Sequence, residues 1–490
     1  MISDLLFKRI EINKRAAERN AVVDGNRSFT YGKLCKLIDS FGSVIRQQGI
    51  QKGETVAIYL PNSVEFIISF FALSRLGVIS LPLNVTNRET ELEYYLSTTG
   101  SRYVITEGEY LSEIEGLKSS CDLKLILVKG ESNCWSVEKM DEISTSGTAI
   151  DEDDKVLYLF STGSTGKPKC ISRTHANLRA LAENHTSTAG WNEDDGILMA
   201  VPMSHTYGFG NFVSAIQAGA TIYTIADFNR KEVTDILSSG RITTFPAVPF
   251  MLDMLSRSRN LSGKDFSSLK LVFSAGAPLA TRIFQDFKRN YGIYPRQLYG
   301  SSETGVISIN MSRDIEKKNR SVGRPVKNVE VKIVDNDGKE LTFGEEGEII
   351  VKSPSMTSCY ENSDQESEKS FRNGFYYTGD TGFIDDKGYI FITGRKKLFI
   401  NISGYKVDPV ELEQLLLENK NIREVAVKGE LNASGQEIIK AFIVPEKTMK
   451  YSEIVDFCRS RISEYKIPRI VEFRESLPKS PTGKILKAKL

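Results

Sequence analysis

The sequence predicts an α/β protein that contains more than one domain. The chain has 490 residues, which is more than one hydrophobic core usually organises, so two or three cores are expected. In the first 150 residues or so, helical patterns alternate with short apolar segments such as 55–60 and 103–106. This order favours a mostly parallel sheet covered by helices.

The composition argues against several classes of protein. The 64 basic residues nearly balance the 63 acidic ones, so the net charge of +1 gives no electrostatic case for binding nucleic acid. The six cysteines have no CxxC or CxxH spacing and predict neither a zinc site nor a disulfide framework. The N-terminus does not resemble a signal peptide, and the most apolar segment, 66–73, is too short to cross a bilayer and predicts a buried helix. A reducing cytoplasm is therefore the expected location.

The segment 160–169, with the sequence FSTGSTGKPK, has the composition of a phosphate-binding loop. Its two glycines let backbone N–H groups approach an anion, its hydroxyls can donate to phosphate oxygens, and its two lysines supply charge. The apolar run 156–160 predicts a buried strand that leads into the loop. The expected ligand is a nucleoside triphosphate.

Two other interpretations of this loop are possible. A Walker A motif needs a glycine five positions before the Gly-Lys pair and a Ser or Thr after the lysine. Ser161 and Pro168 occupy those positions, and a proline there removes both an N–H group and the helical continuation. The other alternative is a flexible linker rich in Ser, Thr and Gly, and the apolar strand before the loop argues against it.

The motif STGSTGKPK after a strand resembles the phosphate-loop signature of the adenylate-forming superfamily, which includes acyl-CoA synthetases, adenylation domains of peptide synthetases and luciferases. Further matches follow in the family's order from residue 29 to residue 490. The resemblance implies a large N-terminal domain of helix-covered mixed α/β sheets, residues 1–394, and a small mobile α+β lid, residues 395–490. It also implies ATP and Mg²⁺ as cofactors.

Several segments besides the phosphate loop supply the nucleotide site in this resemblance. The segment 271–279 reads as a strand that ends in small residues, which would let a flat adenine ring approach the backbone. The segment 297–304 contains an aromatic residue to stack a base, a glycine to approach the ribose, and hydroxyl and carboxylate groups for phosphate and Mg²⁺. A polar loop with an incidental glutamate is the alternative for 297–304. The predicted nucleotide-binding residues are Ser161, Thr162, Gly163, Ser164, Thr165, Gly166, Lys169, Gly276, Ala277, Pro278, Tyr299, Gly300, Ser301, Asp380 and Arg395.

The resemblance also assigns the residues that take part in the chemistry. Glu303 is the predicted Mg²⁺ ligand and, with Ser302, is counted among the catalytic residues; Ser302 replaces the family's threonine and keeps the hydroxyl. Lys484, after a Pro-x-Gly turn, matches the mobile catalytic lysine, and a solvated basic tail is its alternative. Asp380 matches the carboxylate that binds both ribose hydroxyls, and a turn aspartate bonded to its own backbone is its alternative. Arg395 is expected as a second ribose or phosphate ligand.

The segment 202–209 predicts one wall of an acyl pocket. His205 lies among aromatic and glycine residues, so the residues alone leave open a pocket wall or a satisfied core histidine. The resemblance favours the pocket, with His205 beside the substrate carboxylate and without a role in proton transfer; Tyr207 and Phe209 are the other pocket residues. No acidic residue occurs in 204–226. An amino-acid substrate is disfavoured because its ammonium group would need a carboxylate partner, so a fatty or aromatic acid is expected.

Within the lid, the resemblance assigns two further residues. Lys397 matches the hinge, although Leu398 departs from the acidic residue that usually follows. Gly404 lies in a glycine loop that runs into a capped helix, and the resemblance implies that it faces the thiol tunnel during thioester formation. Before the lid, the polar and acidic segment 355–369 is expected to be a mobile loop.

The sequence thus predicts an enzyme that activates a fatty or aromatic carboxylic acid as acyl-AMP and transfers the acyl group to a thiol. Coenzyme A is the expected acceptor, because no carrier domain or phosphopantetheine-serine motif is seen in the chain. A separate acyl carrier protein is the alternative acceptor. The alternative of another class is a catalytically silent nucleotide or acyl-adenylate binding protein, against which the joint presence of Glu303, Asp380, Arg395 and Lys484 argues.

Overall fold

The computed structural model describes residues 1–129, 149–161, 168–257, 266–396, 400–402, 405–432, 437–459, 461–480 and 483–490, with 125–129, 401, 405, 406 and 488 described by their backbone alone. The described helices are α1 (Asp4–Ile12), α2 (Tyr31–Gln47), α3 (Val64–Arg75), α4 (Glu89–Thr99), α5 (Leu111–Gly116), α6 (His175–Ala189), α7 (Thr206–Ala218), α8 (Arg230–Leu237), α9 (Pro249–Ser256), α10 (Thr281–Tyr291), α11 (Asp364–Ser370), α12 (Pro409–Leu417) and α13 (Tyr451–Arg459). None of these described helices has the length and apolar character needed to span a membrane.

The first sheet has six strands in the order β6-β5-β3-β4-β7-β8. Its strands are β3 (Thr55–Ile58), β4 (Ile79–Pro82), β5 (Tyr103–Glu107), β6 (Leu125–Lys129), β7 (Lys155–Ser161) and β8 (Lys169–Thr174). All neighbours pair in parallel except β7 and β8, which are antiparallel and flank the phosphate loop. The predicted parallel sheet is therefore confirmed, and β8 makes it mixed.

The second sheet has nine strands in the order β15-β14-β13-β12-β11-β9-β10-β1-β2. Its strands are β1 (Asn20–Asp24), β2 (Arg27–Thr30), β9 (Gly196–Met199), β10 (Thr221–Thr224), β11 (Thr244–Ala247), β12 (Leu271–Ser274), β13 (Pro295–Ser301), β14 (Gly305–Ile309) and β15 (Arg324–Pro325). The strands from β1 to β13 along this order are parallel, and the strands at both edges are antiparallel.

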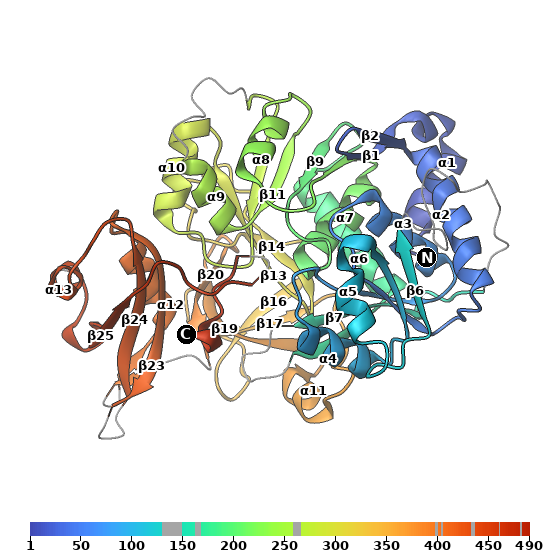
Figure 1. Cartoon of the computed structure of the whole chain (residues 1–490). Coiled ribbons are helices and arrows are strands. Elements are labelled where there is room, and N and C mark those ends of the chain that lie inside the picture. Colours follow the sequence, from blue (N-terminus) through green and yellow to red (C-terminus); the bar gives the residue numbers. More distant parts are fainter. Residues whose placement is uncertain are drawn as a thin grey trace.

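Helices α3 and α7 join the two sheets into one core (Figure 1). Helix α3 contains the predicted buried helix and begins at Ser63, whose side chain accepts a hydrogen bond from the Phe66 backbone. The rings of Phe70 on α3 and Phe209 on α7 lie 4.9 Å apart, edge to face. The same cluster of buried side chains includes Val56 of β3 and Ile197 of β9, so it contacts both sheets.

A third, antiparallel sheet follows the second. It consists of β16 (Glu330–Val334), β17 (Gly347–Lys352), β18 (Phe371–Arg372), β19 (Phe375–Ile384) and β20 (Ile390–Arg395). Asp380 lies within β19, directly opposite Arg395 of β20, rather than in a tight turn. The expectation of a loop over 355–369 is corrected in part, because α11 covers Asp364–Ser370, and Ser355, Thr357 and Tyr360 before it are buried. The mobility of the segment stays a prediction.

The C-terminal part has its own core. It contains β21 (Ile400–Ile402), β22 (Tyr405–Val407) and a three-stranded sheet of β23 (Ile422–Leu431), β24 (Glu437–Pro445) and β25 (Ile470–Phe473), with α12 and α13. Side chains from these elements form a separate cluster, which agrees with the predicted α+β lid. In Figure 1 this part lies at the opposite side of the molecule from the N-terminus. The exact boundary after residue 394 stays a prediction.

Candidate active site

The hairpin of β13 and β14 carries several predicted site residues. Gly300 on β13 has no room for a side chain, because an added Cβ would lie 2.4 Å from the carbonyl oxygen of Gly305 on β14. Gly300 was predicted from the sequence to let a ribose approach the backbone. The close approach of the two strands also requires a glycine at this position. This packing fixes the backbone of Tyr299 and Ser301 on either side.

Tyr299 and Arg395 both bind Asp380. The Tyr299 hydroxyl donates to Oδ2 of Asp380 at 2.6 Å, and Nε of Arg395 donates to Oδ1 at 2.5 Å. Burial, with the Asp380 charge as a second cause, raises the pKa of Tyr299 well above its ordinary value, so the phenol stays a donor. The charge of Asp380 raises the pKa of Arg395 in turn. The result is a buried carboxylate held from two sides.

Glu303 lies in the turn between β13 and β14 and is only 7% exposed. Its Oε1 accepts a hydrogen bond of 3.0 Å from the Tyr360 hydroxyl, and its backbone carbonyl accepts one of 2.9 Å from the Thr357 N–H. In the described part of the chain, no group of three or more His, Cys, Asp or Glu side chains forms a metal cage. One fixed carboxylate suits a Mg²⁺ ion whose other ligands are phosphate oxygens of the nucleotide and several water molecules.

Ser302, next to Glu303, is bound by two residues that the sequence analysis missed. Its hydroxyl accepts a bond of 3.0 Å from Thr206, and its carbonyl accepts one of 2.6 Å from the Arg173 guanidinium. Arg173 on β8 is 1% exposed. Burial lowers its pKa to about 10, and the charge of Glu303 opposes that shift. A charged residue inside the otherwise uncharged segment 170–174 was the available signal.

The two ends of the phosphate loop are joined by a β-pair. Ser161 at the end of β7 is the register partner of Lys169 at the start of β8. The Lys169 ammonium binds Glu366 of α11 at 2.6 Å and lies 4.6 Å above the ring of Tyr360. Lys169 is therefore paired with α11 in this structure, and its role at the phosphate stays a prediction. The predictions for Thr162, Gly163, Ser164, Thr165 and Gly166, for the hinge Lys397 and for Gly404 lie outside the described residues.

Lys484 reaches the same region from the end of the chain. Partial burial lowers the pKa of Lys484, Arg395 lowers it further, and Asp380 opposes the shift. The pKa of His205 is lowered to about 4, first by burial and then by Lys484. These electrostatic interactions indicate that Lys484, whose side chain is partly exposed, lies in the neighbourhood of Asp380, Arg395 and His205. The turn before it packs on α9, since an added Cβ on Gly483 would lie 3.2 Å from Cβ of Phe250.

The residues predicted to line the acyl pocket lie in two different places. His205 caps α7, because its Nδ1 accepts a bond of 3.3 Å from the Tyr207 backbone N–H. His205, near Lys484, and Thr206, which donates to Ser302, lie at the start of this helix, and Tyr207 follows them. Phe209 is different: it is 1% exposed and packs against Phe70 and Phe212 in the core. The expectation that Phe209 lines the pocket is corrected, because the helical turn directs it toward α3.

Residues 276–278, which are predicted to lie against the adenine ring, directly follow β12 and are exposed. Gly276 has a φ of +84°, a left-handed conformation that side chains disfavour. Strand β12 runs parallel to β13, with Ser274 opposite Gln297. Residues 276–278 consequently follow the end of β12 and Tyr299 lies near the end of the adjacent β13, at the edge where open α/β sheets bind ligands.

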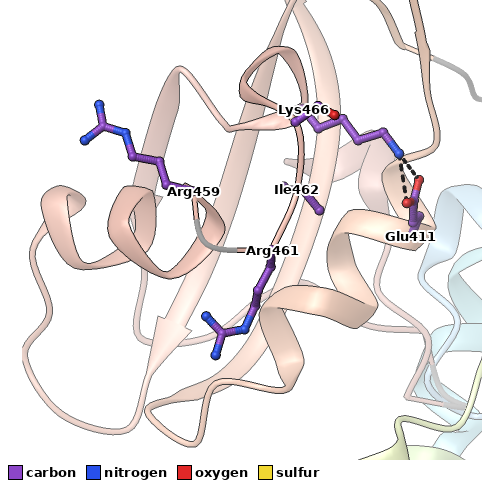
Figure 2. A pocket seen from close by; sticks show the side chains of 6 residues that line it. Glu411, Arg459, Arg461, Ile462 and Lys466 are labelled. Carbon is purple, nitrogen blue, oxygen red and sulfur yellow. Dashed lines mark hydrogen bonds and ion pairs between the residues drawn. The ribbon is translucent and has the colours of Figure 1, made fainter.

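A separate pocket of about 470 Å³ lies in the C-terminal part, lined by Glu411, Arg459, Arg461, Ile462, Ser463 and Lys466. Figure 2 shows the guanidinium groups of Arg459 and Arg461 pointing in different directions. The Lys466 ammonium is held by both carboxylate oxygens of Glu411 at 2.8 Å. The positive side chains that line this pocket do not point toward one place, so the pocket is not the candidate active site.

Comparison with known proteins defines the class. The AMP-binding enzyme family model matches residues 10–361, and the model for the AMP-binding enzyme C-terminal domain matches 411–484. An indoleacetate–CoA ligase of Aromatoleum aromaticum is 30% identical over 96% of this chain and 94% of its own length. A long-chain-fatty-acid–CoA ligase of Mycobacterium tuberculosis is 29% identical over 94% of this chain and 92% of its own.

A solved structure agrees over nearly the whole chain. The anthranilate CoA ligase AuaEII, in complex with anthranoyl-AMP, superposes with a TM-score of 0.90 at 26% identity, covering 99% of this chain and 95% of that one. The fold and site together define an adenylate-forming, ATP-using acid–thiol ligase. The chain belongs to the AMP-binding enzyme family, and the resemblance drawn from its sequence is confirmed.

Proposed function

We propose that this ligase joins an aromatic or fatty carboxylic acid to coenzyme A in two steps, using Mg-ATP. The observation that carries the proposal is the buried Asp380 carboxylate, held by Tyr299 and Arg395, with Lys484 near enough for its charge to interact with Asp380, Arg395 and His205. This arrangement supports one shared site for the predicted catalytic lysine, the nucleotide and the acid. The relatives that use indoleacetate, long-chain fatty acids and anthranilate support this range of acids.

In the first step, a carboxylate oxygen of the acid attacks the α-phosphorus of ATP, and the bond from that phosphorus to the pyrophosphate oxygen breaks. Negative charge gathers on the phosphate oxygens, where the Lys484 ammonium and the Ser302 hydroxyl would stabilise it. Asp380, held by Tyr299 and Arg395, would accept the ribose hydroxyls. Glu303 would hold Mg²⁺, which supplies charge neutralisation and orients the phosphates.

In the second step, the thiolate sulfur attacks the acyl carbonyl carbon and AMP leaves with the bonding electrons. This step requires no protein nucleophile. The lid is proposed to move so that Gly404 replaces Lys484 at the site. Coenzyme A is favoured over a carrier protein, because the relatives named above are CoA ligases.

A reducing compartment, such as the cytoplasm, is proposed as the location. The described cysteines, Cys35, Cys121, Cys170, Cys359 and Cys458, are all free thiols. Free thiols are expected where the glutathione and thioredoxin systems keep cysteines reduced.

The test is a panel of fatty acids and of aromatic acids with and without polar substituents. ATP–pyrophosphate exchange measures the first step, and thioester formation with coenzyme A or a purified carrier protein measures the second. Exchange with an aromatic or a fatty acid, followed by thioester on coenzyme A, is expected. Binding of ATP without exchange for any acid would instead indicate a silent binding protein.

A further inference from the structure

One buried tyrosine connects the phosphate-loop strand to the Glu303 turn. Tyr360 is 3% exposed. Its backbone forms an antiparallel bridge with Ile171 of β8. The backbone N–H of Glu361, the next residue, donates to the carbonyl oxygen of Cys170 at 3.0 Å. Its hydroxyl donates to Oε1 of Glu303 at 3.0 Å. The residue thus spans the strand that leaves the phosphate loop and the carboxylate proposed to hold Mg²⁺.

The Tyr360 ring is fixed by its surroundings. The Lys169 ammonium lies 4.6 Å above it, and the ring of Phe371 lies 5.3 Å away, edge to face. Glu366 holds Lys169 in that position at 2.6 Å. A phenol fixed in this way has little freedom to turn its hydroxyl away from Glu303.

A second buried tyrosine supports the Tyr360 hydroxyl. Tyr376 is 7% exposed, and its side chain is hydrogen-bonded to that of Tyr360. The Tyr360 hydroxyl has one proton, which it donates to Oε1 of Glu303, so Tyr376 is the donor to Tyr360. The two hydroxyls therefore form a chain that ends on one carboxylate oxygen of Glu303.

We propose that Tyr360 is a positioning residue that holds the Glu303 carboxylate in the orientation that binds Mg²⁺ with the ATP phosphates. The inference rests on the proposed role of Glu303. Because outer partners orient metal ligands and typically change metal affinity ten- to hundredfold, removing the hydroxyl alone should weaken the metal without disturbing the acid site. The other contacts of the ring, to Lys169 and Phe371, would survive in phenylalanine.

The experiment measures metal binding directly in Tyr360→Phe. Mn²⁺ affinity is read by electron paramagnetic resonance in the presence of a non-hydrolysable ATP analogue, and the Mg²⁺ dependence of ATP–pyrophosphate exchange is measured beside it. We expect about tenfold weaker Mn²⁺ binding and a similar rise in half-saturating Mg²⁺, with an unchanged KM for the acid. Tyr31→Phe is the matched control, because Tyr31 is 1% exposed and its hydroxyl donates to the Ala220 carbonyl at 2.8 Å, away from Glu303.

Two results would overturn the inference: wild-type Mn²⁺ affinity in Tyr360→Phe, or an equal loss in Tyr31→Phe. A Glu303→Gln background separates it from the proposed function. If Glu303→Gln alone leaves Mn²⁺ affinity unchanged, the metal role of Glu303 fails. If that variant loses the metal and Tyr360→Phe has no additional effect in it, the tyrosine acts through Glu303. Should Tyr360→Phe not fold, Tyr376→Phe tests the same hydroxyls, and unchanged Mn²⁺ affinity there would equally count against the proposal.

Discussion

Tyr299 and Asp380, 81 residues apart, are joined by a hydrogen bond of 2.6 Å between the phenol and Oδ2. Arg395 binds the other oxygen, so the carboxylate is oriented before any nucleotide arrives. Preorganisation of this kind lowers the cost of binding, because the side chain need not be ordered at that moment. Each carboxylate oxygen has a second lone pair with which it can accept a ribose hydroxyl.

Asp380→Asn is expected to weaken ATP binding. The amide keeps the shape of the carboxylate but loses its charge, and a hydrogen bond to a charged group contributes about 1.5–3 kcal/mol. The KM for ATP in pyrophosphate exchange should therefore rise about ten- to hundredfold. Asp385→Asn, in the same hairpin but bound to Lys318, is the control and should leave the KM for ATP near its wild-type value. Similar changes in both variants would contradict the assignment.

Lys484→Ala should separate the two half-reactions. The ammonium is proposed to stabilise charge on the phosphates during adenylation only, so acyl-AMP formation should fall by about two to three orders of magnitude. Conversion of supplied acyl-AMP to thioester should stay near normal. Both steps are measured on one preparation, with Lys489→Ala, an exposed lysine of the last turn, as the control for charge. Loss of both steps would instead mean that the lid has been disrupted.

Gly300→Ala should destabilise the β13–β14 hairpin. The added methyl group would lie 2.4 Å from the Gly305 carbonyl oxygen, and backbone on both sides prevents easy relief. Forcing extra atoms into a packed site costs about 1–3 kcal/mol, so the melting temperature should fall. Gly108→Ala is the control, since no atom lies within 4 Å of its added Cβ. Equal melting temperatures for the two variants would show that the hairpin accommodates the methyl group without a loss of stability.

Acid should destabilise the protein through His185. Both ring nitrogens of this buried histidine lack a partner among the described residues, and burial lowers its pKa from 6.5 to about 3. The unfolded chain therefore binds a proton that the folded chain does not, and stability present above pH 6.5 is lost as the pH falls toward 3. The loss is at most about 1.4 kcal/mol per pH unit.

The variant His185→Phe tests this dependence. Phenylalanine can keep the contact with Trp191, whose ring lies 4.6 Å from that of His185. The fall in melting temperature between neutral and mildly acidic pH should be smaller in the variant than in the wild type. If the melting temperature falls equally with pH in the two proteins, other groups cause the acid sensitivity.

The sequence by itself determined the local elements and the family. The apolar runs around residues 66–73 and 156–160 predicted α3 and β7, because hydrophobic periodicity and strand propensity depend on neighbouring residues. The phosphate-loop motif and the Pro-x-Gly turn before Lys484 are also short, contiguous patterns. Their order along the chain was enough to identify the superfamily.

The tertiary structure alone decided which distant side chains meet. Nothing near Arg173 in the sequence indicates that it binds the Ser302 carbonyl, and nothing near Tyr360 indicates Glu303, because those contacts follow from sheet register and from segments folded back over the strands. The same holds for Phe209, which the sequence assigned to a pocket and the packing of α7 on α3 placed in the core. Such contacts depend on long-range packing, and a local pattern carries no information about which partner lies across the fold.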